Sequence, residues 1–310
     1  MIEINSLEDC SFKPEDQIVV ALGFFDGIHQ AHQCLIDTCI NHAKARNGKS
    51  VLFTFQNHPS SVLNPDNQTP LITPYPLKRQ ILLSYDIDYV VAIQFDENLC
   101  HTSAKDFTND VLMKRLAAHE IIVGYNFHFG HNRQGSADML KTLSINSFDE
   151  IVVIEQQFHD DAPVSSSRIR QSVIQGNLSE AANLLGRPYF FAGNVINGDG
   201  RGLSIGFPTA NINIDSQAIP PHGVYGVRVR LDHIDAAPLN GVMNIGNVPT
   251  FTDESHTTAE VHILDFNEDI YNRFIIVEFV ELLRHEKKFS SKDELVNQIK
   301  LDIETYKSHL

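Results

Sequence analysis

The chain has 310 residues, of which 42% are hydrophobic and 20% are charged, and its formal net charge at pH 7 is −15. This length predicts two domains with a hydrophobic core in each. The acidic balance excludes nucleic acid and anionic membrane surfaces as main partners, because those surfaces bind clustered Lys and Arg.

The first half of the chain alternates buried-looking strands with helical patterns. A helix is predicted over 31–42, where apolar or small residues recur at helical spacing. Ser103 and Asp106 form a capping box before a helix at 104–116, and 165–185 reads as closing helices. The predicted strands are 17–22, 51–55, 89–94, 120–123 and 150–155. This alternation predicts a parallel sheet with helices on both faces, which binds ligands beyond the carboxyl ends of its strands.

After residue 186 the pattern changes to strands that are separated only by turns. Ser291 and Glu294 cap a final helix that is predicted to end near residue 308. The predicted strands are 189–196, 207–214, 223–231, 239–245, 257–264 and 272–282. This order predicts an antiparallel barrel followed by a helix. Because the halves show no similarity to each other, we interpret the chain as a fusion of two domains, 1–185 and 186–310.

The first candidate site lies where the first predicted helix begins. The strand at 17–22 runs into Gly23-Phe-Phe-Asp-Gly-Ile-His29-Gln-Ala-His32. The two histidines share one helix face near the positive end of the helix dipole, which suits a bound anion. They would donate hydrogen bonds to phosphate oxygens as charge develops. Two polar histidines on a surface helix are the alternative interpretation.

A second helix start carries similar groups. Ser165-Ser-Ser-Arg-Ile-Arg170 places the hydroxyls of Ser166 and Ser167 where they can cap the helix and bind phosphate. The planar guanidinium of Arg170 follows one turn later. A plain serine cap with exposed arginines is the alternative. Together with the two histidines, these groups predict one phosphate site in an α/β domain.

The clearest indication of phosphate binding is the stretch Asn197-Gly-Asp-Gly-Arg-Gly-Leu-Ser-Ile-Gly-Phe-Pro-Thr-Ala-Asn211. Thr209 and Asn211 share one strand face, where their oxygens can hold Mg²⁺ together with nucleotide phosphates. The stretch is neither a Walker A loop nor a dinucleotide fingerprint. A flexible hairpin that enters an ordinary strand is the alternative. Its glycines, which allow close backbone approach, are Gly198, Gly200, Gly202 and Gly206, and Pro208 follows them.

The run Gly206-Phe-Pro-Thr-Ala-Asn211 resembles the signature of riboflavin kinases, and the first half is similar to the flavin adenylyltransferase module of bacterial bifunctional enzymes. Further kinase-like matches are 223–226, 243–246, 249–251, 260–262, 269–271 and 287–289. The adenylyltransferase-like matches are 23–32, 53–55, 58–59, 123–130 and 165–170. The resemblance covers essentially the whole chain. It implies a nucleotidyltransferase-like Rossmann-type α/β domain followed by a six-stranded antiparallel Greek-key barrel with a C-terminal helix.

The resemblance implies a bifunctional enzyme of flavin biosynthesis. ATP would phosphorylate riboflavin to FMN in the barrel, and a second ATP would convert FMN to FAD and pyrophosphate in the α/β domain. The implied catalytic residues are Glu260, His29, His32 and Arg170, and the implied Mg²⁺ ligands are Thr209 and Asn211. The implied flavin-binding and nucleotide-binding residues are Gly23, Phe25, Asp26, Gly27, His58, Asn126, Ser166, Ser167, Gly198, Gly200, Gly202, Gly206, Pro208, Asn244 and Arg284, and Thr250 would border the ligand.

The sequence departs from the family pattern at three positions. Ala31 replaces a glycine, Asn57 replaces a proline, and His285 replaces the proline expected after Arg284. A methyl group at Ala31 could crowd the nucleotide. Glu260 is implied as the base that deprotonates riboflavin, although a solvent-facing strand carboxylate is the alternative.

Two other functions stay open. One is a riboflavin kinase whose adenylyltransferase half is impaired at Ala31 and Asn57, and the other is a non-catalytic flavin-binding regulatory module. Cysteines at 10, 34, 39 and 100 show no C-x-x-C spacing, and no apolar run approaches the length of a membrane span. We therefore expect a soluble cytoplasmic enzyme that acts on small molecules, with a weak homo-oligomer left open.

Overall fold

A computed structural model describes residues 1–143, 148–198, 200, 202–214, 216–248 and 256–310. The chain divides into two compact units. The first unit comprises Met1–Leu71 and Lys78–Arg168, and the second comprises Ile72–Leu77 and Ile169–Leu310. The predicted boundary between residues 185 and 186 stays a prediction.

The first unit contains a sheet of six parallel strands in the order β1-β4-β3-β2-β5-β8. The strands are β1 (Ile2–Ile4), β2 (Ile18–Leu22), β3 (Ser50–Phe55), β4 (Tyr89–Ile93), β5 (Ala118–Gly124) and β8 (Glu150–Ile154). All five residues of β2 are buried, as expected for a strand that lies inside a parallel sheet. The predicted parallel sheet is confirmed, but the edge strand β1 was missed because three residues are too few to show a period.

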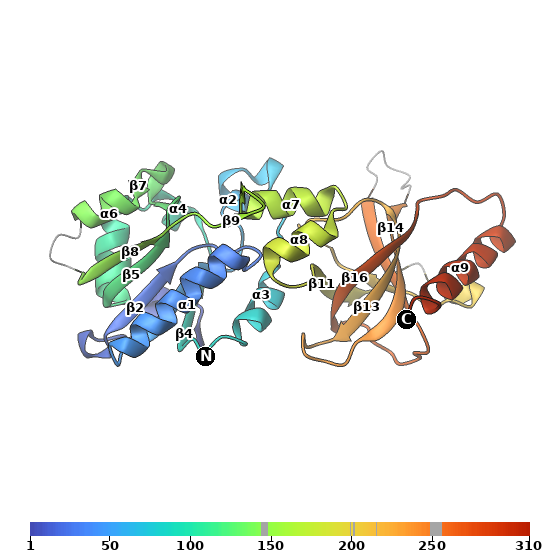
Figure 1. Cartoon of the computed structure of the whole chain (residues 1–310), viewed down its shortest axis with the longest axis horizontal. Helices are drawn as coiled ribbons and strands as arrows, with labels where there is room; N and C mark the ends of the chain where they lie inside the picture. The colour runs from blue at the N-terminus through green and yellow to red at the C-terminus, as the bar shows by residue number, and fades with distance from the viewer. Residues whose placement is uncertain (144–147, 199, 201, 215, 249–255) are drawn as a thin grey trace. The chain divides into compact units, whose positions relative to one another are not determined.

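Helices cover the sheet of the first unit. Helix α1 (Gln30–Ala45) lies along one face (Figure 1), where it buries Leu35, Ile36, Cys39, Ile40 and Ala43. The other helices of the first unit are α2 (Ser60–Leu63), α4 (Glu97–His101), α5 (Ala104–Asp106), a π-helix (Phe107–Arg115) and α6 (Ala137–Leu143). The unit boundaries fall within α3 (Tyr75–Leu82) and α7 (Ser166–Ile174), and α8 (Leu178–Leu185) belongs to the second unit. Two short hairpins pair β6 (His128–Phe129) with β7 (Gly135–Ser136), and β9 (Phe158–His159) with β10 (Ala162–Pro163). Single 3₁₀ turns are Leu7–Asp9, Pro14–Asp16, Pro65–Asn67, His131–Arg133 and, in the second unit, Leu203–Ile205.

The predicted N-cap at Ser103 is confirmed, while the full capping box stays a prediction. The hydroxyl of Ser103 accepts a hydrogen bond from the backbone N–H of Asp106 at 3.1 Å and donates one to its carboxylate at 2.7 Å. The helix that follows is not α-helical along its whole length, because it continues from Phe107 as a π-helix.

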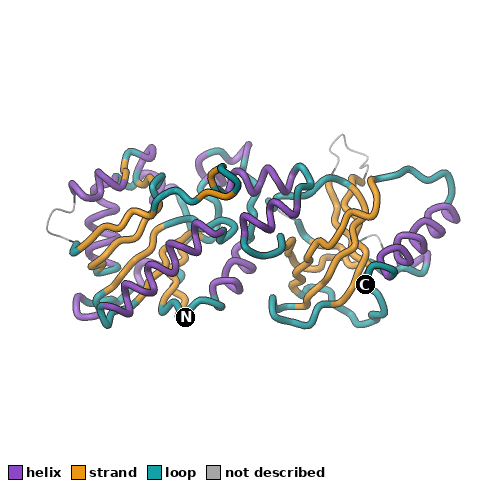
Figure 2. Tube along the Cα trace, viewed as in Figure 1, coloured by secondary structure: helices purple, strands orange, loops and turns teal. Residues whose placement is uncertain are grey.

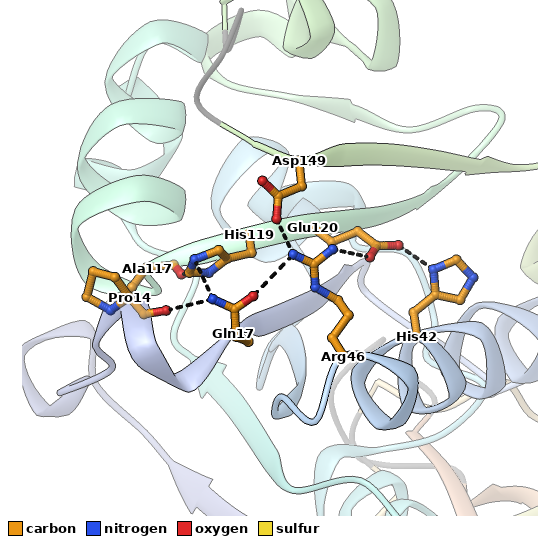
Figure 3. A network of polar contacts seen from close by, with 8 residues as sticks. All are labelled: Pro14, Gln17, His42, Arg46, Ala117, His119, Glu120 and Asp149. Atoms are coloured by element: carbon orange, nitrogen blue, oxygen red, sulfur yellow. Dashed lines mark hydrogen bonds and ion pairs between the residues drawn. The ribbon is translucent and has the colours of Figure 1, made fainter.

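A polar network ties α1 to the amino end of the sheet (Figure 3). The buried carboxylate of Glu120 on β5 accepts from His42 and, at 3.5 Å, from Arg46. Arg46 also pairs with Asp149 and donates to Gln17 at 3.3 Å. Both oxygens of Glu120 are therefore engaged in holding α1 to β5, which makes the network structural.

Glu120→Gln is expected to lower the free energy of unfolding of the first unit by about 3 kcal/mol, because it leaves the half-buried donors His42 and Arg46 without their buried anionic partner. Urea unfolding measures this loss. Glu15→Gln is the matched control, since Glu15 is exposed and its carboxylate lies 4.0 Å from the exposed Lys13, outside this network. The control is expected to change stability by less than about 0.5 kcal/mol. An equal loss in both variants would contradict the role assigned to Glu120.

The second unit contains a closed barrel in the order β11-β12-β15-β14-β13-β16. Its strands are β11 (Phe190–Ile196), β12 (Ala210–Ile212), β13 (Gly223–Leu231), β14 (Leu239–Val248), β15 (His256–Ile263) and β16 (Phe274–His285). All neighbouring strands pair antiparallel. The predicted six-stranded antiparallel barrel is confirmed, although β12 is shorter than the predicted strand at 207–214.

Helix α9 (Lys292–Lys307) packs beside the barrel strands (Figure 2). Ser291 caps it as predicted, accepting from the backbone N–H of Glu294 at 3.2 Å. Tyr306, which is fully buried, donates its hydroxyl to the carbonyl of Val227 at 3.0 Å. Gly226 makes this contact possible, because a Cβ there would lie 2.4 Å from the tyrosine ring. The last turn of α9 is thus fixed on β13.

Candidate active sites

A cavity of about 830 Å³ opens in the first unit at the carboxyl ends of the parallel strands. The last residues of β2, β3, β5 and β8 line it, namely Leu22, Phe55, Gly124 and Ile154. This is the edge at which a sheet of this kind binds ligands. The predicted site residues that line the cavity are Gly23, Phe25, His29, His32, His58, Asn126, Ser166 and Ser167.

The two histidines at the start of α1 are stacked. Their ring centroids lie 3.6 Å apart with an angle of 15° between the planes. His29 also caps the helix, because its Nδ1 accepts the backbone N–H of His32 at 3.4 Å. A neutral imidazole that accepts at Nδ1 carries its proton on Nε2. The cap therefore fixes the tautomer whose Nε2–H can donate to a ligand oxygen. The sequence analysis did not predict that His29 caps α1.

The loop between β2 and α1 has an unusual backbone. Phe25 and Ile28 adopt positive φ angles of 55° and 42°, and Gly27 has a φ of 88°. Phe25, Asp26 and Gly27 are all buried. Asp26 and Gly27 are not among the described residues that line the cavity, so the structure places them behind its wall. Positive φ at non-glycine residues is strained and persists only where the surrounding structure holds it.

The start of α7 differs in detail from the sequence analysis. Ser165, rather than Ser166 or Ser167, caps the helix, since its hydroxyl accepts the backbone N–H of Arg168 at 3.3 Å. Ser166 instead donates to the carbonyl of Asp26 at 2.9 Å and so joins α7 to the loop before α1. Arg170 is half-buried on α7 and is not among the described residues of the cavity lining.

Both departures from the family pattern in this half lie at or beside the cavity. Ala31 lines it between the two histidines in the sequence. The side chain of Asn57 bonds both backbone groups of Phe95, accepting from its N–H at 2.8 Å and donating to its carbonyl at 3.0 Å. Asn57 therefore fixes the chain before His58 through hydrogen bonds, where a proline would fix it through its ring.

Several aromatic side chains of the cavity were missed as site residues. They are Phe24, Phe55, Phe95, Tyr125 and Phe127. Each comes from the end of a strand or from the residues just after it. Their position at the carboxyl ends of strands in a predicted parallel sheet could have identified them, because ligands bind at that edge.

In the second unit, the predicted kinase residues form a row across three neighbouring strands. Asn211 on β12 pairs with Glu260 on β15, which pairs with Asn244 on β14. Residues that are directly opposite lie on the same face of a sheet. Thr209 joins them, because its hydroxyl donates to the Glu260 carboxylate at 3.2 Å. One hydroxyl, two amides and one carboxylate thus converge, and these oxygen donors suit a hard cation such as Mg²⁺.

The glycine-rich loop packs closely against this row. A Cβ at Gly198 would lie 2.0 Å from the side-chain nitrogen of Asn211, and one at Gly202 would lie 3.0 Å from Oγ1 of Thr209. Gly200 and Gly206 have positive φ angles of 67° and 89°. The carbonyl of Pro208 accepts from Nδ1 of His262 at 2.8 Å, which holds the start of β12.

Arg284 and Thr250 were also predicted to lie near the ligand. Arg284 on β16 pairs with Val224 on β13, and Val224 pairs with Asn244, so Arg284 continues the row two strands further. Its Nε donates to both carboxylate oxygens of Asp302 on α9 at 3.0 Å. Its guanidinium also stacks 5.5 Å from the ring of Phe289. Arg284 thus holds α9 to the barrel, and its contact with flavin stays a prediction. Thr250 lies outside the described residues.

Gly198→Ala is expected to reduce the riboflavin phosphorylation that the sequence resemblance implies for this half at least about tenfold, because the added methyl group must displace the Asn211 amide from the row. FAD formation from supplied FMN should stay at the wild-type rate. Parallel assays of the two reactions on one preparation measure this difference. Unchanged phosphorylation would show that the position of Asn211 does not matter.

Comparisons with known proteins connect both sites to flavin chemistry. The family model of FAD synthetase matches residues 12–168, and that of riboflavin kinase matches residues 185–310. A bifunctional riboflavin kinase/FMN adenylyltransferase from Escherichia coli K12 is 33% identical over 299 residues, which are 96% of this chain and 95% of that protein. The chain belongs to this bifunctional flavin-transferase family. It is a transferase with both activities, as the sequence analysis predicted.

Other relatives of the family agree in sequence and fold. The protein of the same name from Bacillus subtilis 168 is 34% identical over 290 residues, covering 92% of this chain and 90% of its own. A crystal structure titled as a macrolide-efflux protein from Streptococcus pneumoniae superposes with a TM-score of 0.81 at 31% identity, covering 99% of this chain and 98% of its own. Among the described residues, no helix has the length and apolar character needed to cross a bilayer.

Proposed function

We propose that the cavity of the first unit is the site of adenylyl transfer. A phosphate oxygen of FMN attacks the α-phosphorus of ATP, a new P–O bond forms, and the bond to pyrophosphate breaks. FMN already carries a competent nucleophile, so no covalent intermediate with the enzyme is required. The observation that supports this assignment is that the starts of α1 and α7 both reach one cavity.

Each group in this cavity has a proposed role. His29 and His32 donate to the oxygens on which charge builds, which is the general way in which nucleotidyl transfer is accelerated. Ser167 offers a further hydroxyl. Arg170 is not among the described residues that line the cavity, and it is proposed to neutralise the β- and γ-phosphates from α7. Asn126 is proposed to hold the flavin or ribose.

We propose that the row on the barrel is the site of riboflavin phosphorylation. Glu260 takes the proton from the terminal hydroxyl of the ribityl chain while that oxygen attacks the γ-phosphorus of ATP, and ADP leaves. The hydroxyl of Thr209 donates to the Glu260 carboxylate, which keeps one carboxylate oxygen oriented. A base within reach of the alcohol typically contributes 10²–10⁴-fold to the rate.

Thr209 and Asn211 are proposed to hold Mg²⁺, and their oxygen donors fit this ion. When bound, the ion would neutralise charge on the ATP phosphates. The glycine-rich loop would place its backbone N–H groups around those phosphates. We assign adenylyl transfer to residues 1–185 and phosphorylation to 186–310, in a cytoplasmic enzyme whose partners are small molecules.

Product analysis of the full chain with riboflavin, ATP and Mg²⁺ tests the proposal. We expect FMN to form first, together with ADP, and FAD to follow, together with pyrophosphate. FMN without FAD would favour an impaired adenylyltransferase half, and Ala31→Gly would then be expected to restore FAD formation. Bound flavin without any product would favour a regulatory module.

A further inference from the structure

A fully buried lysine lies behind the wall of the adenylyltransferase cavity. Lys78 on α3 is only 1% exposed. Its ammonium donates to the carbonyls of Phe24 and Phe55 at 2.9 and 2.8 Å, and to the hydroxyl of Thr54 at 3.2 Å. Thr54 in turn donates to the carbonyl of Phe24 at 2.9 Å. The Phe24 carbonyl therefore accepts from two donors, both of which come from outside its own loop.

Burying an ammonium group is costly unless its protons are hydrogen-bonded. Burial lowers the pKa of Lys78 to about 7, although the negative charge of Asp26 acts in the opposite direction. The hydrogen bonds offset part of this cost, and so does the ring of Phe24, whose centroid lies 4.4 Å from Nζ. Phe24 thus supplies two of the interactions that hold the ammonium, and it belongs to the short segment between β2 and α1.

That segment forms part of the cavity. The ring of Phe24 lines it and meets the ring of His58 edge-on, with the centroids 4.8 Å apart. The residues that follow, Phe25, Gly27 and Ile28, have the positive φ angles described above and lead directly to His29. A strained loop needs fixed points to stay in one conformation.

We propose that Lys78 is a positioning residue for adenylyl transfer, which anchors the Phe24 carbonyl and thereby sets the place of the loop that ends at His29. The inference rests on the proposed function of the cavity. Lys78 is not among the described residues that line the cavity. It therefore acts through Phe24 and not directly on the substrate. A loop displaced by about 1 Å can cost up to about a hundredfold in rate.

The test is Lys78→Met in the full chain, which keeps the length of the side chain and removes its charge. We expect kcat for FAD formation from FMN to fall about ten- to a hundredfold, with KM for FMN changed less than about threefold. Riboflavin phosphorylation, measured on the same preparation, should stay within about twofold. Unchanged kcat for FAD formation would overturn the inference.

Two further variants separate positioning from stability. Leu82→Ala removes a fully buried side chain from the same helix and should lower the melting temperature without reducing kcat for FAD formation at a temperature where the variant is folded. If its kcat falls as far as that of Lys78→Met, the lysine is merely structural. Thr54→Val removes the second donor to Phe24 and should lower kcat by a smaller factor. If Lys78→Met does not fold, Thr54→Val becomes the test of the inference. An unchanged kcat of Thr54→Val would then refute the anchoring of the Phe24 carbonyl.

The failure of this inference is distinguishable from failure of the proposed site. If the wild-type chain makes FAD and the Lys78→Met variant makes it equally fast, only the role of Lys78 is wrong. If removing the His29 imidazole also leaves FAD formation unchanged, the cavity itself has been assigned wrongly.

Discussion

Glu260→Gln is expected to lower the rate of riboflavin phosphorylation by about two to four orders of magnitude, while FAD formation from supplied FMN continues at the wild-type rate. Glutamine keeps the size of the side chain and can still accept the hydrogen bond from Thr209, but it cannot take a proton from the alcohol. Steady-state assays of FMN formation measure the loss. Flavin affinity, measured by fluorescence titration, should change little.

A matched substitution elsewhere on the barrel controls for loss of charge. Glu281 on β16 is half-buried and pairs with His309, away from the row formed by Asn211, Glu260 and Asn244. Glu281→Gln is expected to leave both reactions within about twofold of wild type, because substitutions of this kind are usually mild. Normal phosphorylation by the Glu260→Gln variant would show that another group removes the proton.

The fold was predictable because both halves have strong local patterns. Completely buried strands such as β2 alternate with helices, which leaves a parallel sheet as the only simple arrangement. In the barrel half, strands follow one another with only turns between them. Helix caps at Ser103 and Ser291 were also readable, since each uses a side chain and a backbone group three residues apart.

Much of the site could not be read from local patterns because it depends on contacts between distant residues. Lys78 lies 54 residues from Phe24 in sequence, and nothing around it distinguishes it from a surface lysine on an amphipathic helix. The compensation at Asn57 is visible only when Phe95, which follows β4, is placed beside it. The cap of α7 was assigned to the wrong serine because Ser165, Ser166 and Ser167 are adjacent and chemically alike, and only their hydrogen bonds distinguish them.

His29→Asn and His29→Ala together test the chemistry of the adenylyltransferase cavity. Asparagine is among the best helix N-caps, so His29→Asn can keep the cap on α1 while it removes the imidazole. Both variants are expected to lower kcat for FAD formation about 10²–10³-fold, because each loses a donor aimed at developing charge. Only His29→Ala should also lower the free energy of unfolding, by about 1 kcal/mol.

The comparison of the two variants decides what the imidazole does. FAD formation from FMN and ATP gives the rate, urea unfolding gives the stability, and riboflavin phosphorylation on the same preparation serves as the internal control. If His29→Asn makes FAD at the wild-type rate while His29→Ala does not, His29 contributes only as a cap. The donor would then have to be His32, whose ring stacks on that of His29 at 3.6 Å and lines the same cavity.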